Sequence, residues 1–292
     1  MNKAYFHLPG LFEFVELYRK FLPLFFNHPE YFYDYCQIGS IYGSPAECLW
    51  GGGRVGYGDG DTIDVLALMK KYNISARLTF SNSLLTTSHL QDRKCNELCK
   101  IFEDDNNGII IYSDLLLEHI KHNYPKYYFV SSTTKVITDF DELIKELDED
   151  EFKYVVPDFR FNKSLYKLQT LTQKQKDKIE LLCNECCDIK CNQRKACYEN
   201  VSRKNLNEDC LDHVCPYNET YSFSNAMKNP SFISVNDIQN TYLPLGINNF
   251  KIEGRSLGSA LVLEFLLYYL TKPEYQINVR EEIYLDNNLD LF

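Results

Sequence analysis

The sequence predicts an α/β protein with a TIM-like (β/α)8 barrel that carries a cysteine-rich insertion between its seventh and eighth strands. Eight short strand-like runs and the amphipathic helical stretches between them predict the barrel. A cluster of seven cysteines within 33 residues predicts the insertion. An open, doubly wound sheet is the alternative that the same alternation of strands and helices allows.

The expected strands are short and mostly apolar. Several of them, such as Gly108–Tyr112, are uninterrupted apolar runs, which are typical of strands covered on both faces. The eight candidates are Ala4–Leu8, Tyr33–Gly39, Ala76–Phe80, Gly108–Tyr112, Tyr127–Ser132, Tyr154–Phe159, Ile179–Cys183 and Phe250–Glu253.

The expected helices have recognisable ends. Asp61 is placed to cap the first of them, and acids follow Asp139, where they complement the positive end of a helix. The helical stretches are 61–73, Leu84–Phe102, Leu115–Asn123, Asp139–Leu147 and Leu257–Leu270. Because residues 184–230 show little apolar periodicity, we expect one barrel domain over residues 1–292 with a metal-binding insertion at 184–230.

The composition narrows the class of protein. Of the 292 residues, 45% are hydrophobic and 14% are aromatic, which indicates a folded chain, and the net charge of −10 argues against a large nucleic-acid interface. The N-terminus lacks the pattern of a signal peptide, and the most apolar segment, Ala260–Leu270, is too short to span a membrane. We therefore expect a soluble, cytoplasmic protein with no membrane partner, in which clustered cysteines are ligands or redox centres rather than disulfides.

The cysteine cluster begins where the predicted seventh strand ends, at the barrel end that carries active-site loops. Four thiolates hold either a 4Fe–4S cluster or a tetrahedral zinc ion, whereas free buried thiols are the third interpretation. The cysteine spacing does not match the paired knuckles of a zinc ribbon. It also does not match the cysteine triplet of radical-SAM enzymes, because Arg194 stands where the last cysteine of that triplet would be. The cluster consists of Cys183, Cys186, Cys187, Cys191, Cys197, Cys210 and Cys215.

The remaining cysteines give weaker signals. Cys95 and Cys99 stand one helical turn apart and are predicted to be packing residues, and Cys36 falls within a strand. Cys48 follows the second strand, from where it can reach a cluster at the barrel mouth. His7, inside an apolar run, is predicted to be a hydrogen-bonded core residue rather than a base.

Three segments resemble the collagenase-like peptidase family U32 and its uncharacterised TIM-barrel relatives. They are Asn184-Glu185-x-Cys187-x-x-x-Cys191, Cys215-Pro216-Tyr217, and Phe250-Lys251-Ile252-Glu253-Gly254-Arg255 with the helix that follows it. The resemblance spans most of the chain after Ile74 and implies a TIM-like barrel. Several members of the family carry a 4Fe–4S cluster on four cysteines and hydroxylate RNA or quinone precursors without oxygen.

The resemblance also implies a ligand set. It favours Cys187, Cys191 and Cys215 as cluster ligands, but the cysteines of this chain are more numerous and differently spaced than those of the better-known members. Four residues are therefore candidates for the fourth ligand, namely Cys183, Cys197, Cys210 and Cys48.

The carboxylates and the arginine at the last two strand ends are the catalytic candidates. Glu185 follows the seventh strand, and Glu253 and Arg255 follow the eighth. Arg255 is placed to fix a carboxylate or phosphate of the substrate, while either glutamate transfers protons. The alternative is a structural Glu–Arg ion pair that holds the barrel mouth together.

These signals predict an iron–sulfur-dependent oxidoreductase, either an oxygen-independent hydroxylase or another redox modification enzyme. Its substrate would be a small molecule, an RNA or a peptide, and it would need an electron donor or acceptor. The alternatives are a zinc-binding structural or interaction barrel, and a peptidase. Neither a G-x-S-x-G nucleophile elbow nor an H-E-x-x-H zinc helix supports the peptidase.

Overall fold

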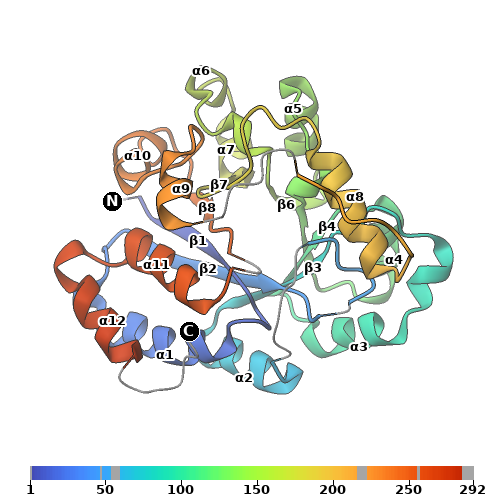
Figure 1. The fold of residues 1–292 in the computed structure, drawn as a ribbon, viewed down its shortest axis with the longest axis horizontal. Coiled ribbons are helices and arrows are strands. Elements are labelled where there is room, and N and C mark those ends of the chain that lie inside the picture. The colour runs from blue at the N-terminus through green and yellow to red at the C-terminus, as the bar shows by residue number, and fades with distance from the viewer. Residues whose placement is uncertain (1, 47, 54–59, 216–221, 255–256, 285–292) are drawn as a thin grey trace.

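The computed structural model describes residues 2–46, 48–53, 60–215, 222–254 and 257–284. Its central feature is a sheet of eight parallel strands surrounded by helices (Figure 1). The strands are β1 (Ala4–Pro9), β2 (Cys36–Gly43), β3 (Ser75–Phe80), β4 (Gly108–Ile111), β5 (Tyr128–Ser131), β6 (Phe152–Val155), β7 (Glu180–Leu182) and β8 (Asn249–Lys251).

The sheet curls into a nearly closed barrel, which confirms the predicted fold class. The strand order is β6-β5-β4-β3-β2-β1-β8-β7, and every neighbouring pair is parallel. A parallel bridge between Val155 and Ile179 joins β6 to the residue that precedes β7. Since all the strands point the same way, their C-terminal ends meet at one mouth of the barrel.

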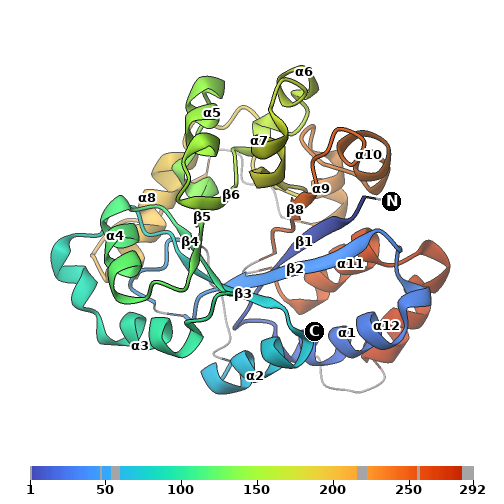
Figure 2. The same cartoon turned by 180° about the vertical axis from the view of Figure 1, so that it is seen from behind.

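Helices cover the outside of the barrel (Figure 2). They are α1 (Val15–Asn27), α2 (Thr62–Tyr72), α3 (Arg93–Phe102), α4 (Asp114–Asn123), α5 (Phe140–Asp148), α6 (Leu165–Leu168), α7 (Gln173–Lys178), α8 (Arg194–Asn205), α9 (Phe223–Lys228), α10 (Val235–Asp237), α11 (Ser259–Leu270) and α12 (Gln276–Tyr284). None of the helices in the described part of the chain is long and apolar enough to cross a membrane.

The predicted helix caps are present. The Asp61 side chain accepts hydrogen bonds from two amides in the first turn of α2, and Asp139 does the same for α5. The stretch Leu84–Phe102 is divided, however, into a 3-10 turn, η2 (Thr87–Gln91), and α3. The break lies at Asp92, whose side chain accepts a hydrogen bond from the amide of Cys95 and so begins a new helix.

Two strands, β2 and β6, are clearly displaced from their expected ranges. The strand β2 begins at Cys36 rather than Tyr33, because the Cys36 amide donates to the Tyr33 carbonyl and closes a turn there. The strand β6 ends at Val155, shortly before Pro157, which has no N–H to donate to the ladder. Phe159 belongs instead to a 3-10 turn, η4 (Phe159–Phe161).

The main core lies between the sheet and the helices. Alternate strand residues such as Leu8, Ile41 and Leu78 are fully buried in it. The barrel interior holds a smaller apolar cluster around Ile110 and Val130. Burial of apolar surface at about 25 cal/mol per Å² stabilises both layers.

The segment between β7 and β8 contains the helices α8, α9 and α10 rather than only metal-shaped loops. The helix α8 was not expected from the sequence, since it buries only Arg194 and Ser202 and so has almost no apolar stripe. It packs near η3 (Thr133–Lys135), the turn that follows β5 at the barrel mouth. The segment therefore lies beside the end of the barrel where loops carry function.

Candidate functional site

A small pocket lies at the C-terminal ends of the strands. About 20 Å³ of free space inside it is enough for one ordered water molecule. The hydroxyl of Thr79, which lines the pocket, is buried and has no hydrogen-bond partner among the described residues. The lining consists of Tyr42, Thr79, Ile110, Ser132, Thr133, Thr134, Val156, Glu185, Tyr198, Lys251 and Glu253.

The loop that leaves β7 brings a carboxylate and two thiols together beside this pocket. One ligand atom from each of Glu185, Cys186 and Cys187 lies within 4.8 Å of the other two. One oxygen of Glu185, Oε1, accepts the amides of Cys186, at 2.9 Å, and Cys187, at 3.1 Å. The carboxylate thus folds the loop back on itself and fixes both cysteines.

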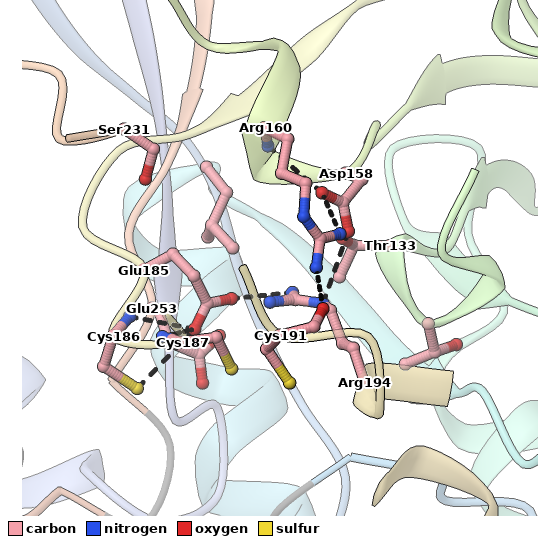
Figure 3. Close-up of polar contacts among 12 residues, drawn as sticks. Thr133, Asp158, Arg160, Glu185, Cys186, Cys187, Cys191, Arg194, Ser231 and Glu253 are labelled. Carbon is pink, nitrogen blue, oxygen red and sulfur yellow. Dashed lines mark hydrogen bonds and ion pairs between the residues drawn. The ribbon is translucent and has the colours of Figure 1, made fainter. Parts of the chain in front are cut away.

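Cys191 stands one turn further along the same loop. Its amide donates to the Asp188 carbonyl at 3.0 Å, and its carbonyl accepts from Nη2 of Arg160. Figure 3 shows the sulfur of Cys191 directed to the same side as the sulfurs of Cys186 and Cys187. Arg160 also donates to the Ile189 carbonyl, so it holds the loop in this shape.

A buried arginine crosses the site behind the thiols (Figure 3). The side chain of Arg194 is only 2% exposed, and its Nη2 lies 2.6 Å from Oε2 of Glu185. Its Nε lies 3.6 Å from Oδ2 of Asp158, and the guanidinium stacks on Phe159 with its carbon 4.7 Å from the ring centre. Nη1 has no hydrogen-bond acceptor among the described residues.

Arg194 is positively charged in this environment. Burial lowers the pKa of Arg194, but neighbouring groups, above all the carboxylate of Glu185, outweigh burial and raise this pKa well above its usual value. A buried donor without an acceptor costs free energy, so Nη1 is an unsatisfied group beside Glu185 and Asp158 in the described part of the chain. Sequence reasoning missed the role of Arg194, which it noted as the residue that stands where a radical-SAM triplet has its last cysteine, three residues after Cys191.

The catalytic candidates are placed differently from one another. Glu185 is buried and ion-paired, while Glu253 is partly exposed and lines the pocket. The Glu253 backbone is fixed by Asn184, whose side chain accepts its amide at 2.7 Å and donates to its carbonyl at 2.8 Å. Arg255 lies outside the described residues.

Cys183 lies apart from the other thiols. It is fully buried in the main core together with Leu181, on the helix-facing side of the sheet, and its sulfur is 3.6 Å from the Leu181 carbonyl. Burial raises the pKa of the Cys183 thiol well above its usual value. As folded, this thiol neither faces the pocket nor favours the thiolate form that metals bind.

The three remaining candidates follow in or beyond α8. Cys197 is half-buried within the helix, Cys210 is half-buried, and Cys215 is exposed. Asn200 of α8 holds the chain near Cys210, since its side chain donates to the Leu211 carbonyl at 2.7 Å. The structure therefore gathers Cys186 and Cys187 with Glu185, directs the sulfur of Cys191 to the same side, and leaves Cys215 at the surface.

A charged layer lies deeper in the barrel. Glu180 is fully buried and pairs with Arg77 at 2.5 Å and with Lys251 at 3.3 Å. Burial opposes ionisation, but Arg77, His7 and Lys251 hold the pKa of Glu180 below its usual value. Burial, reinforced by Arg77, lowers the pKa of His7 to about 3, so His7 is a neutral core residue, as predicted.

The site combines thiol and carboxylate groups, which are kinds of metal ligand, with a buried ion-paired guanidinium and a partly exposed carboxylate suited to proton transfer. The sequence pointed to Glu185, Cys187, Cys191 and Glu253. It did not favour Cys186, which the turn capped by Glu185 brings close to Cys187.

The comparisons with known proteins support the fold. No protein-family model matches the chain, and no curated protein matches it significantly. A solved structure described as the U32 peptidase Mk0906 superposes on it with a TM-score of 0.51, over 87% of this chain and 93% of that one, at 11% sequence identity. At this identity the likeness establishes shape alone. The chain therefore has a U32-peptidase-like barrel fold.

Proposed function

We propose that the chain is an iron–sulfur barrel enzyme in which thiolates of the loop after β7 hold a 4Fe–4S cluster. One observation carries the proposal: the ligand atoms of Glu185, Cys186 and Cys187 lie within 4.8 Å of one another, beside the mouth pocket. Enzymes with this barrel have their active sites at the same end.

The thiols of the loop fit such a group. Thiolates are the usual ligands of iron–sulfur clusters, and Cys187 and Cys191 offer sulfurs on one side of the loop. Cys215 is the proposed third ligand and Cys186, Cys197 or Cys210 the fourth. We leave Cys183 and Cys48 out of the set, because the first packs in the main core and the second faces Cys95.

The pocket residues would bind and orient the substrate. The Lys251 side chain lines the pocket, so an anionic group of the substrate is attracted to this side. Arg255, after β8, is the further candidate for this task. The hydroxyl of Thr79 adds a donor that needs a partner.

The two glutamates would have separate tasks. Glu185 accepts two amides and pairs with Arg194, which makes it the residue that shapes the thiol loop. Glu253 is partly exposed at the pocket and is the proposed proton-transfer group. When bound, the cluster would supply one-electron chemistry, which suits an oxygen-independent hydroxylation or another redox modification.

Structural zinc is the second candidate. The close group at the mouth contains a carboxylate as well as two thiols, and zinc accepts both kinds of ligand. Zinc there would make the segment after β7 a structural or interaction surface. Removal of zinc would then unfold it.

Metal analysis of protein purified without oxygen tests the proposal. We expect about four irons per chain with matching sulfide and a brown colour. Cys187→Ser and Cys191→Ser should lose the iron, whereas Cys36→Ser, at a buried thiol remote from the mouth, should keep it. A colourless protein without iron would contradict the proposal, and one zinc per chain would favour the second candidate.

The peptidase alternative has its own test. The solved protein with the same fold is described as a U32 peptidase. Cleavage of an unstructured polypeptide that survives removal of all metal, and that is lost on substitution of a pocket residue, would support a peptidase and count against the redox enzyme.

A further inference from the structure

A second pair of thiols lies away from the mouth site. Cys48, in the loop that follows β2, and Cys95, in the first turn of α3, have their sulfur atoms 3.4 Å apart. The two residues are 47 positions apart in the sequence, so tertiary packing brings them together. Cys48 is 4% exposed and Cys95 is fully buried. A disulfide has an S–S distance of about 2.05 Å, which the pair reaches by an approach of about 1.4 Å.

The surroundings of the two sulfurs differ. The sulfurs of Cys48 and Cys95 share a hydrogen bond, and the amides of Trp50 and Gly51 also face the Cys48 sulfur; the Cys95 contact is foremost in lowering the pKa of Cys48. The same contact raises the pKa of Cys95. Cys48 is therefore the more readily ionised of the two, which suits an attacking cysteine, and Cys95 suits a resolving cysteine.

Two other buried cysteines lack this arrangement. Cys99 lies one turn after Cys95 on the same helix, and Cys36 lies at the start of β2. Burial raises the pKa of both thiols above the usual value. They are matched internal controls, because they share the burial of the pair without the lowered pKa of Cys48.

We propose that Cys48 and Cys95 form a peroxide-oxidisable dithiol, which closes reversibly into a disulfide between the β2–α2 loop and α3. The sulfur contact between two residues on separate elements carries this inference. It is independent of the metal proposed at the mouth. The low exposure of Cys48 restricts the oxidant to a small molecule of the hydrogen peroxide class.

The chemistry balances in two steps. The Cys48 thiolate attacks one peroxide oxygen, the O–O bond breaks, and hydroxide leaves to take a proton from solvent, which yields a sulfenic acid and one water. The Cys95 sulfur then attacks the Cys48 sulfur. The S–S bond forms, the S–O bond breaks, and the hydroxyl leaves with the Cys95 proton as a second water. Two thiols are oxidised and one peroxide is reduced; a small-molecule thiol reverses the reaction by exchange.

The disulfide would constrain the loop after β2, which is hydrogen-bonded to α8 at the barrel mouth. The carbonyl of Gly51 accepts from Asn205 of α8 at 2.6 Å. Asn82 donates to the carbonyls of Leu49, at 3.0 Å, and Ser202, at 3.1 Å. The loop after β2 and α8 therefore share hydrogen bonds, and α8 carries Arg194 and Tyr198 into the site.

Peptide mapping tests the inference on the full chain as purified. The protein is treated with hydrogen peroxide, its free thiols are blocked, and it is digested without reductant. We expect a Cys48–Cys95 cross-linked peptide that disappears on addition of dithiothreitol, with Cys36 and Cys99 blocked as free thiols. Cys48 and Cys95 both recovered as free thiols, or a Cys48 cross-link to another cysteine, would overturn the proposal.

Two variants test the roles of the pair. In Cys95→Ser the sulfenic acid has no resolving thiol, so dimedone should label Cys48 and not Cys36 or Cys99. In Cys48→Ser the same treatment should leave Cys95 unlabelled. Dimedone labelling of Cys95 in the Cys48→Ser variant would contradict the assignment. So would a Cys95→Ser variant in which dimedone does not label Cys48. Cys99→Ser is the matched control, and it should form the cross-link to the wild-type extent.

Discussion

At the residue scale, the side chain of Arg194 links the cysteine loop to the barrel. Its guanidinium lies between the carboxylates of Glu185 and Asp158, 2.6 Å from the first and 3.6 Å from the second. All three side chains are almost fully buried. Only arginine offers donors in several directions with a charge that burial does not remove.

Replacement of Arg194 by methionine should therefore be costly. Glu185 would lose this buried cation, whereas Asp158 would keep its pairing with Arg160, and we expect the free energy of unfolding to fall by about 3 kcal/mol. Urea denaturation monitored by circular dichroism measures the change. Arg203→Met is the matched control, since Arg203 lies on the same helix and pairs with Glu208 at an exposed position, which is worth less than about 1 kcal/mol. Equal losses in the two variants would contradict this reading.

The buried His7 predicts a pH dependence of stability. Its pKa is about 3 in the folded chain, against an unperturbed 6.5, so the unfolded chain binds the extra proton first as the pH falls. The stabilisation is complete above pH 6.5 and is lost progressively between pH 6.5 and pH 3. From the two values, His7 alone should lower the free energy of unfolding by about 2 kcal/mol between pH 7 and pH 5.

Denaturation midpoints measured at pH 7 and at pH 5 test this prediction. His7→Gln should remove most of the loss that His7 causes, while His28→Gln, at an exposed histidine, should leave the pH dependence of the wild type. A pH dependence identical in His7→Gln and wild type would show that His7 is not the titrating group.

At the scale of elements, the loop after β2 depends on a close backbone approach. A Cβ added at Gly52 would lie 2.1 Å from the carbonyl oxygen of Ser81, and backbone atoms cannot move aside as a flexible side chain can. Gly52→Ala should destabilise the chain by about 1–3 kcal/mol, as overpacking does elsewhere. A thermal denaturation midpoint equal to that of the wild type would show that the loop can accommodate a Cβ at position 52, and would contradict the prediction.

Element types were easier to predict than their boundaries. The caps Asp61 and Asp139 are local signals, so the starts of α2 and α5 could be read from the sequence. The helix α8 could not, because its exposed surface is polar and it buries only Arg194 and Ser202. The amphipathic helix α1, which buries Leu17, Phe21 and their neighbours, carries a periodic signal that the sequence analysis did not use.

The candidate site was predictable only where its members follow strand ends. Glu185 and Cys187 come directly after β7, so barrel topology brings them to the mouth. The buried state of Arg194 depends on Asp158, which follows β6 and is 36 positions away in the sequence. No local pattern encodes such a pairing, and the same holds for the contact between Cys48 and Cys95.

At the scale of the whole molecule, the residues that stabilise the barrel differ from the residues that form the candidate site. Its inner charged layer around Glu180 and its outer apolar core maintain the shape, while the segment between β7 and β8 places thiols, Arg194 and Tyr198 at the mouth. The shape is shared with a solved U32 peptidase at only 11% identity. The patterns of strands and helices, rather than particular residues, therefore specify the fold, and the site residues specify what this chain does.

The position of the metal is the most direct test of this account. Crystals of the full chain, grown without oxygen, would be measured by anomalous diffraction at the iron edge and at the zinc edge. We predict iron density bonded to the sulfurs of Cys187 and Cys191, next to the pocket lined by Glu185 and Glu253. Ordered loop thiols with no metal between them, or iron bound at any other place on the chain, would contradict the central claim.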